Sequence, residues 1–512
     1  MIDKFKAVIE NKEMKPKNIF FFIIINVVLL TTISMIFPSK GIKITKNFSI
    51  NFITFNEYFA GNQKNVDISE IINDSKVEEV EFDKEISTID TLLQLTKNKA
   101  FPIKIDTVKR YLEFPGGNKT ILYKFFGQLS EVQETGKVLR IMHYGDSQIE
   151  TDRISEYLRN KLQNQFGGEG PGFMSAILPF DVQKPMAQKA EGSWKRYTAY
   201  GKSDTSVYHR RYGVLGNFCK FSPIVKPSKD STKLNILDKN LFVNKQSYKA
   251  SLFYEESKYT QKNVKKFSKC RMFYGYNAEE VTVDLTINQT EVRKEKLAAS
   301  SNLEIKTWTF DQTPKSLKFE FESKDSPEFY GFAFDGNSGI SVDNIPLRGA
   351  DGLMFTRMDL KMLGYFYSYL NTKLLILQFG GNTVPGEHEN YDFYRRSFSK
   401  QIKTLKAIAP DLTIIVIGLA DMSKKDKDQY ITYPNVVLIR DALKKAAFEN
   451  NCPYWDMFEA MGGANSMPSW VTADPPLAEK DYTHFTPQGS RIIAKMFYNA
   501  FIYEYNQYLN QK

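Results

Sequence analysis

The sequence has few of the residues that build disulfide frameworks and metal sites. It contains only three cysteines, Cys219, Cys270 and Cys452, and four histidines among 512 residues. The cysteines are odd in number and widely spaced, so they predict neither a disulfide framework nor a zinc site. Cys219 and Cys270 fall in one β-rich region and are able to pair. Buried free thiols are the alternative that we favour for all three.

Sequence signals for nucleic-acid and nucleotide binding are also missing. The formal net charge of +10 is modest for this length, and the lysines are scattered rather than interleaved with aromatic residues, which argues against a nucleic-acid partner. The glycine-rich segment Gly167–Phe173 lacks the lysine of a phosphate-binding loop and follows a predicted helix rather than a strand. We therefore interpret it as a loop near a cleft.

Three of the four histidines have ordinary structural interpretations. His143 precedes Gly145 by two residues and so points to the same side of a strand, which favours a hydrogen-bonded imidazole in the core. His209 and His388 lie in polar stretches and are predicted at the surface. No H-x-x-H or paired-cysteine spacing argues for a metal.

Only one apolar run is long enough to span a bilayer. It covers Ile19–Phe37, and as a helix it would be roughly 28 Å long. More lysines precede the run than follow it, which places residues 1–18 in the cytoplasm as a short tail. The alternative is a cleaved signal peptide, but no A-x-A site follows the run. We expect an uncleaved signal anchor in the inner (plasma) membrane, with the rest of the chain in the periplasm or outside the cell.

The most informative residues are two short polar motifs more than 300 positions apart. Gly145-Asp146-Ser147-Gln148 ends an apolar strand that begins at Val138, and Asp481-Tyr482-Thr483-His484 lies close to the C-terminus. A serine hydroxyl becomes nucleophilic when an imidazole takes its proton and a carboxylate orients that imidazole. The placement of Ser147 after a strand and before a predicted helix at 154–158 puts its side chain at the carboxyl edge of an open α/β sheet, where such folds bind ligands.

Two further strands end in glycine or polar turns. The buried run Leu374–Phe379 ends in Gly380-Gly381-Asn382, and the strand Gly339–Ile345 runs into Pro346–Gly352. Each of these turns, like the two motifs above, is weak evidence alone. The four together, in the order Ser, Gly, Asn and Asp-x-x-His, resemble the SGNH/GDSL hydrolase superfamily over residues 139–173 and 339–505.

The resemblance implies a role for each matching residue. Ser147 corresponds to the nucleophile, His484 to the general base and Asp481 to the acid that orients it. The oxyanion donors would be the backbone N–H groups of Ser147 and Gly349 and the side-chain amide of Asn382. Neither a metal nor an organic cofactor is implied.

The sequence departs from the common family pattern in two places and leaves one position open. The first block reads G-D-S-Q rather than G-D-S-L, which we interpret as the loss of a packing residue only. The third block reads G-G-N-T rather than G-x-N-D. Gly352 lies three residues after Gly349 in the same turn and is the alternative oxyanion residue.

Between the first two blocks the hydrophobic periodicity changes from helical to strand-like. Several short strands separated by polar turns predict a β-sandwich inserted at residues 174–337. Such an insertion resembles the peptidoglycan O-acetylesterase branch of the superfamily, in which a carbohydrate-binding-module-like domain interrupts the hydrolase. Glycan binding is only implied by that resemblance, and a structural lid is the alternative.

The remaining segments complete a fold prediction. Residues 38–116 are charged and weakly patterned, as in a stalk or a small packing extension. Residues 117–173 and 338–512 alternate between strands and helices and predict the two parts of one three-layer α/β/α sandwich with a parallel sheet.

The predicted function is a serine ester hydrolase that removes short acyl groups, O-acetyl in particular, from an extracytoplasmic glycan such as peptidoglycan. An O-acyltransferase acting on a cell-envelope polysaccharide would use the same residues. A catalytically inactive glycan-binding envelope protein is a third alternative, which the intact Ser147, Asn382, Asp481 and His484 oppose. An acylated glycan and, through the N-terminal helix, the membrane are the expected partners. The oligomeric state is left open.

Overall fold

The computed structural model describes residues 16–38, 42–45, 48–50, 66–72, 102–105, 107–178, 185–224 and 246–512. The chain divides into two compact units. One comprises Met1–Lys64 with Asp426–Gln429, and the other comprises Asn65–Lys425 with Tyr430–Lys512. All the predicted site residues belong to the second unit.

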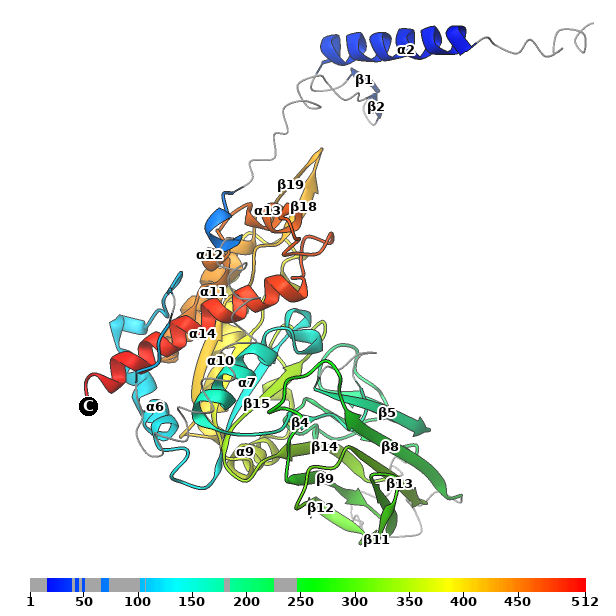
Figure 1. Ribbon diagram of the computed structural model, residues 1–512, viewed down its shortest axis with the longest axis vertical. Helices are drawn as coiled ribbons and strands as arrows, with labels where there is room; N and C mark the ends of the chain where they lie inside the picture. The colour runs from blue at the N-terminus through cyan, green and yellow to red at the C-terminus, as the bar shows by residue number, and fades with distance from the viewer. Residues whose placement is uncertain are drawn as a thin grey trace, which may run out of the picture. The chain divides into compact units, whose positions relative to one another are not determined.

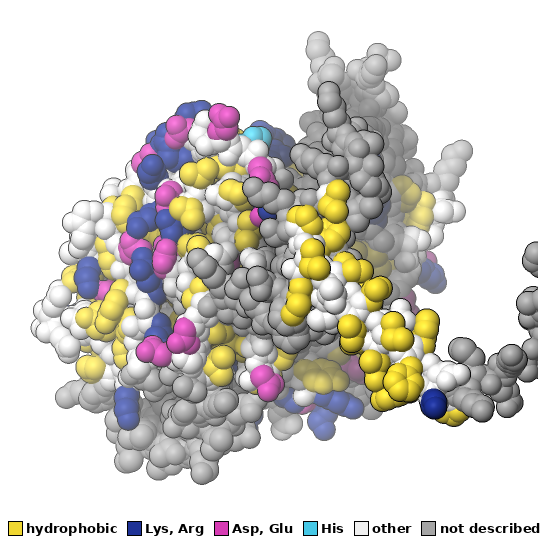
Figure 2. All heavy atoms as spheres, turned by 90° about the horizontal axis from the view of Figure 1, so that it is seen from above, with side chains coloured by type: hydrophobic (Ala, Val, Ile, Leu, Met, Phe, Trp, Pro, Cys, Tyr) yellow, Lys and Arg dark blue, Asp and Glu magenta, His cyan; other side chains and the backbone are white. Residues whose placement is uncertain are grey.

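The first unit contains the apolar helix and a small hairpin. Helix α2 (Pro16–Ile36) is 21 residues long and buries none of its residues, and it forms a continuous hydrophobic surface in Figure 2. Strands β1 (Ile42–Thr45) and β2 (Phe48–Ile50) pair antiparallel. The helix is long and apolar enough to cross a membrane, and a signal sequence meets the same criterion.

A five-stranded parallel sheet lies at the centre of the second unit (Figure 1). All five strands were predicted, and they are rich in Val, Ile and Leu because helices cover both faces of the sheet. In spatial order they are β15 (Gly339–Pro346), β3 (Val138–Gly145), β16 (Thr372–Gln378), β17 (Thr413–Ile417) and β20 (Tyr454–Trp455).

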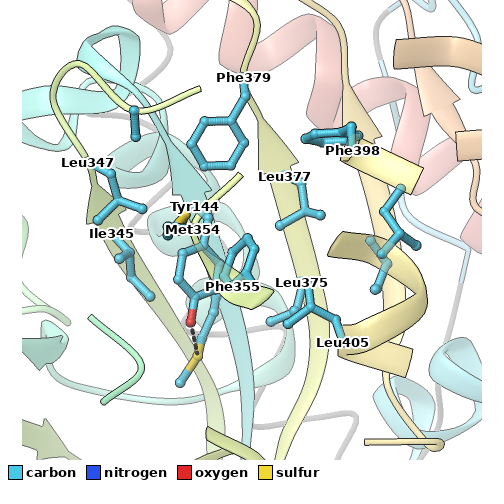
Figure 3. Close-up of a cluster of buried hydrophobic side chains, with 14 of the residues drawn as sticks. Tyr144, Ile345, Leu347, Met354, Phe355, Leu375, Leu377, Phe379, Phe398 and Leu405 are labelled. Carbon is cyan, nitrogen blue, oxygen red and sulfur yellow. Dashed lines mark hydrogen bonds between the residues drawn. The ribbon is translucent and has the colours of Figure 1, made fainter. Parts of the chain in front are cut away.

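The longer helices of the second unit form the outer layers of this sandwich. Those packed with one buried cluster are α6 (Tyr123–Ser130), α7 (Ser155–Phe166) and α14 (Pro487–Leu509). Those packed with the other are α9 (Leu360–Tyr369), α10 (Asp392–Ile408) and α11 (Val436–Glu449). Figure 3 shows part of the second cluster, where Leu377 of β16 lies near Phe398 of α10 and Leu375 of β16 lies near Leu405 of α10. The three-layer prediction is confirmed.

The inserted region forms two antiparallel sheets packed face to face, which confirms the predicted β-sandwich. One sheet contains β11 (Glu291–Leu297), β10 (Val281–Ile287), β13 (Ser316–Ser323), β8 (Tyr248–Glu256) and β5 (Met186–Gly192). The other contains β12 (Ser300–Thr309), β9 (Lys269–Asn277), β14 (Glu328–Asp335), β7 (Asn217–Lys220), β6 (Lys195–Thr198) and, beside β14, β4 (Gly172–Met174). Strand β4 therefore extends across the boundary that we set at residue 173.

The insertion and the hydrolase layers share one core. Phe173, Phe273 and Tyr330 pack in the same buried cluster as Phe366 of helix α9. The guanidinium of Arg140 in β3 is fully buried and pairs with Asp335 of β14 at 2.7 Å and with Asp343 of β15 at 2.5 Å. Losing one member of such a network leaves an uncompensated buried charge. The insertion is thus a built-in part of the second unit.

Two features near the ends of the first hydrolase segment clarify open sequence assignments. Residues 102–105 lie against α14, because Asn506 exchanges side-chain hydrogen bonds with both backbone groups of Ile103. These residues fit a packing extension better than a stalk.

In the glycine-rich loop, a Cβ atom on Gly168 would lie 2.2 Å from the carbonyl oxygen of Ile340. The glycine there permits close approach to β15.

Candidate active site

The structure brings Ser147, His484 and Asp481 into one hydrogen-bonded line. Ser147 Oγ lies 2.8 Å from His484 Nε2, and His484 Nδ1 lies 2.6 Å from Asp481 Oδ2. The other carboxylate oxygen of Asp481 accepts the backbone N–H groups of Thr483 at 2.9 Å and His484 at 3.0 Å. The Asp-x-x-His turn therefore fixes both the carboxylate and the ring, and the remaining ring nitrogen faces the serine.

The electrostatics of the line suit a general base. Burial alone would raise the pKa of Asp481, but hydrogen bonds from the His484 ring and from two backbone N–H groups outweigh it and hold the pKa below its usual value. An ionised Asp481 stabilises the imidazolium that forms when His484 accepts the serine proton. The side chains of His484 and Asp481 are 28% and 49% exposed, so the line opens to solvent.

Asp146 positions the nucleophile turn. Strand β3 ends at Gly145, and Asp146 caps the 3₁₀-helix η3 (Ser147–Asp152) by accepting the backbone N–H of Gln148 at 3.0 Å. Helix α7 begins only at Ser155, so Ser147 opens a 3₁₀ turn before the predicted helix. Burial raises the pKa of Asp146 to about 6, against hydrogen bonds from the backbone N–H groups of Gln148 and Gly381. Through Gly381, Asp146 also ties the nucleophile turn to the Asn382 turn.

The predicted oxyanion donors lie on three adjoining turns. Asn382 follows β16 in the 3₁₀-helix η5 (Gly381–Thr383), and its Nδ2 donates to the carbonyl of Ala350 at 3.0 Å. That bond uses one of the two amide hydrogens and leaves the other available. Among the described residues, no hydrogen bond engages the backbone N–H of Ser147 or Gly349.

The surroundings of the two glycines favour Gly349 over Gly352. Gly349 is exposed, has a φ of +77° and leaves open space around its Cα. Gly352 is buried, and a Cβ atom there would lie 2.9 Å from the rings of Phe379 and Phe398. Gly352 is therefore a packing glycine, and its N–H is far less accessible to a ligand.

Gln148 has a role that the sequence interpretation missed. Its side-chain Nε2 donates to the carbonyl of Thr483 at 2.5 Å, inside the Asp-x-x-His turn. The backbone N–H of Ser423 holds the same turn through the carbonyl of Tyr482 at 3.1 Å. The glutamine that replaces the usual leucine therefore links the turn of the nucleophile directly to the turn of the base.

Replacing Gln148 with leucine is expected to lower kcat by about 2- to 10-fold. Such a change corresponds to the loss of one hydrogen bond, worth about 0.5–1.5 kcal/mol, that positions His484. KM for a small ester should change little, because Gln148 is buried. Steady-state kinetics on p-nitrophenyl acetate, with the melting temperature as a control for folding, measure the effect. An unchanged kcat would show that the turn keeps its position without this bond.

The sequence interpretation also missed the charged residues around the serine turn. Arg348, next to Gly349, pairs with buried Glu150 through both carboxylate oxygens. Arg153 donates to the carbonyl of Ser147 at 3.0 Å. The pair of Arg348 and Glu150 joins residues 198 positions apart, so no local spacing could have revealed it.

The remaining sequence assignments have mixed outcomes. His143 is fully buried between Ser155 and Gln378, and burial lowers its pKa to about 4, which confirms a neutral core imidazole. His388 is exposed as predicted. The surface assignment of His209 is wrong, because its ring pairs with buried Glu328 at 2.9 Å and is only 9% exposed. All three cysteines are buried free thiols.

Comparisons with known proteins find likeness in structure only. No family model and no curated protein sequence matches the chain. A peptidoglycan O-acetylesterase of known structure superposes with a TM-score of 0.57 at 17% identity, over 77% of this chain and 99% of that chain. The protein has the SGNH/GDSL hydrolase fold.

Two other solved structures match over much less of this chain. An acetyl xylan esterase matches at 16% identity over 31% of this chain and 81% of its own, with a TM-score of 0.25. A GDSL-like lipase from Parabacteroides merdae matches at 15% identity over 31% and 72%, with a TM-score of 0.23. The SGNH/GDSL assignment therefore concerns the fold, and the chemistry has to be argued from the site itself.

Proposed function

We propose that this protein is a serine ester hydrolase that removes short acyl groups, O-acetyl in particular, from an extracytoplasmic glycan such as peptidoglycan. The observation that carries the proposal is the hydrogen-bonded line from Ser147 through His484 to Asp481. Next to it, the turns of Gly349 and Asn382 supply N–H groups suited to an oxyanion. An activated nucleophile and preorganised donors are the parts that acyl transfer requires.

The proposed reaction has two halves. Ser147 Oγ attacks the ester carbonyl while His484 Nε2 takes its proton, and the N–H groups of Ser147 and Gly349 and the Asn382 amide hold the oxyanion. As the bond between the carbonyl carbon and the sugar oxygen breaks, His484 gives its proton to that oxygen, so the sugar leaves as an alcohol and the acyl group stays on Ser147. In the second half His484 activates a water, which attacks the acyl group and regenerates the serine.

The exposure of the site favours water over a sugar hydroxyl as the second nucleophile. An acyltransferase must keep water from its acyl-enzyme, whereas the imidazole here is partly open to solvent. Acyl transfer to a glycan remains the outcome to exclude. It would appear as acylated acceptor sugar in place of free acid.

The glycan part of the proposal has two supports. One solved structure that superposes over 77% of this chain is a peptidoglycan O-acetylesterase. The N-terminal helix α2 suits either a membrane anchor or a signal sequence, and both would deliver the catalytic unit to the outer side of the membrane. O-acetylated peptidoglycan is therefore the first polymer to test.

The deciding experiment compares polymer and small esters. The chain is incubated with O-acetylated peptidoglycan and with short- and long-chain p-nitrophenyl esters, and the released acid is quantified. We expect acetate from the glycan, a preference for short acyl chains and no release by a Ser147→Ala variant. Activity only on long-chain esters would refute the O-acetylesterase proposal and indicate a lipase.

Deletion of Met1–Pro38 tests the proposed anchor. The truncated protein should be soluble and keep its activity on small esters, because all the proposed catalytic residues lie in the second unit. The full-length chain should fractionate with membranes and resist extraction by carbonate, as expected for a spanning helix. A full-length product that appears in the soluble fraction shortened by about forty residues would instead indicate a cleaved signal peptide.

A further inference from the structure

Arg196 is a half-buried charge that no proposed catalytic step uses. It lies in strand β6 of the insertion, and its side chain makes no hydrogen bond or ion pair with any described residue. Its Nη1 atom is shielded from solvent. Buried polar groups in native proteins are almost always hydrogen-bonded, and an unpaired guanidinium is especially costly. The shielded Nη1 of Arg196 therefore lacks the acceptor that such a donor normally has among the described residues.

The atoms around Arg196 enclose a small cavity beside the nucleophile turn. The cavity volume is about 40 Å³, and its wall includes Thr151 and Asp152 at the end of η3 and Pro346, three residues before Gly349. That space would hold about three ordered waters or one carboxylate group. The insertion thus places the cationic side chain of Arg196 in the wall of a cavity that residues of the nucleophile turn also line.

The other polar groups in the cavity are already satisfied. Asp152 and Arg159 pair with each other through both ends, and Arg159 Nε also donates to the carbonyl of Val342 at 2.7 Å. The amide of Asn344 donates to the carbonyl of Ile149 at 3.0 Å, and that of Asn217 to Leu215 at 3.0 Å. Arg196 therefore brings the one uncompensated charge among the described residues of this wall.

The backbone of the cavity wall is strained. Thr151 and Asp152 have consecutive positive φ angles of 55° and 65°, a region that non-glycine residues seldom occupy. Strained residues persist where surrounding contacts hold them, and they gather at binding sites. Here the bond of Asp152 to Arg159 holds the strained turn and shapes the space that Arg196 faces.

Further charged groups lie on the neighbouring turns. Arg153 and Arg348 lie on the nucleophile and oxyanion turns, and both lie close to the buried carboxylate of Glu150. Tyr200 lies within electrostatic range of Arg196, Arg348 and Glu150, so Arg196 shares its surroundings with the ion pair of the oxyanion turn.

We propose that Arg196 binds a carboxylate of the glycan, carried by the acylated sugar or by its neighbour, and that the protein therefore acts on an acidic glycan. This inference rests on the proposed esterase function. A guanidinium fork matches the two oxygens of a carboxylate. A phosphate is larger than the cavity suits and would call for more than one unpaired cation. Binding at Arg196 would orient the ester without touching the reacting atoms.

The test uses glycan strands that differ only in charge. Peptide-free, unacetylated peptidoglycan strands with free carboxylates are compared with the same strands after amidation, as inhibitors of p-nitrophenyl acetate hydrolysis by the full-length chain. We expect inhibition at least about 10-fold stronger for the carboxylate form, the size of effect typical of a charge-assisted hydrogen bond. Oligogalacturonate and its amidated form provide a second acidic pair.

Variants of Arg196 assign the preference to this residue. Arg196→Gln should abolish the preference for carboxylate strands, and Arg196→Lys should keep part of it. Both should leave kcat/KM on p-nitrophenyl acetate within about 2-fold, since that ester has no carboxylate. The matched control is Arg293→Gln on β11, a charge that is partly exposed and already paired with Glu291, and it should keep the full preference.

The outcomes separate this inference from the proposed function. Equal inhibition by charged and amidated strands, inhibition by neither acidic pair, or a preference that survives in Arg196→Gln would overturn the carboxylate site. Each of these leaves the esterase proposal intact as long as p-nitrophenyl acetate hydrolysis depends on Ser147. If hydrolysis continues in Ser147→Ala, the proposed function itself fails.

Discussion

Replacing either Ser147 or His484 with alanine is expected to lower kcat on p-nitrophenyl acetate by about 10⁴-fold or more. The two side chains share one step, because the imidazole 2.8 Å from Ser147 Oγ must take the proton as the hydroxyl attacks. Removing either partner disables that step. For the same reason the double variant should be scarcely slower than each single variant.

Two matched controls separate chemistry from folding. Ser130→Ala removes a hydroxyl that only donates to the carbonyl of Gly127 in α6, and His388→Ala removes an exposed imidazole. Both should retain nearly full activity, and all four variants should melt cooperatively near the temperature of the parent. Near-full esterase activity in Ser147→Ala would show that another residue is the nucleophile.

The parallel sheet was predictable because each strand leaves a clear local pattern. Strands such as Leu374–Phe379 are buried on both faces, so they appear as unbroken apolar runs that end in glycine or polar turns. The polar turns after β3, β15 and β16 then meet at one sheet edge, because the strands are parallel. The order of the four motifs along the chain was therefore enough to place the candidate residues together.

The elements that were missed lack such a pattern. Strand β11 reads Glu-Val-Arg-Lys-Glu-Lys-Leu and lies at a sheet edge with most side chains in solvent, so it shows no apolar alternation. Strand β14 is buried at every position, and its Gly331 interrupts the run. Short elements such as β18 (Ser423–Asp426) and α13 (Ser466–Thr472) carry too few residues for a period to emerge.

Within the site, the sequence revealed the candidate catalytic residues but not the hydrogen bonds that hold them in place. Ser147, Asn382 and His484 stand out because their motifs are short and local. The bond from Gln148 to Thr483 joins residues 335 positions apart, and the unpaired state of Arg196 depends on the fold of the insertion. Long-range hydrogen bonds of this kind follow from three-dimensional packing, so one sequence gives no signal for them.

Replacing Asn382 with alanine is expected to lower kcat by about 10²–10³-fold, the usual effect of losing one oxyanion donor. The developing negative charge on the carbonyl oxygen would lose the free amide hydrogen, whereas the ground-state ester depends on it little. KM should therefore change far less than kcat. Steady-state kinetics on p-nitrophenyl acetate measure both constants.

Asn382 also donates a hydrogen bond to the carbonyl of Ala350. The effect of losing this structural bond on kcat therefore has to be separated from the effect of losing an oxyanion donor. Asn382→Asp keeps the shape of the side chain but replaces the donor with a negative charge, so it should lose at least as much kcat as Asn382→Ala. If Asn382 served only to hold the Ala350 turn, both variants would lower the melting temperature, and kcat would fall in proportion to that loss. A large fall in kcat at an unchanged melting temperature identifies the amide as a donor to the transition state, and a kcat within about 3-fold of the parent would remove Asn382 from the oxyanion site.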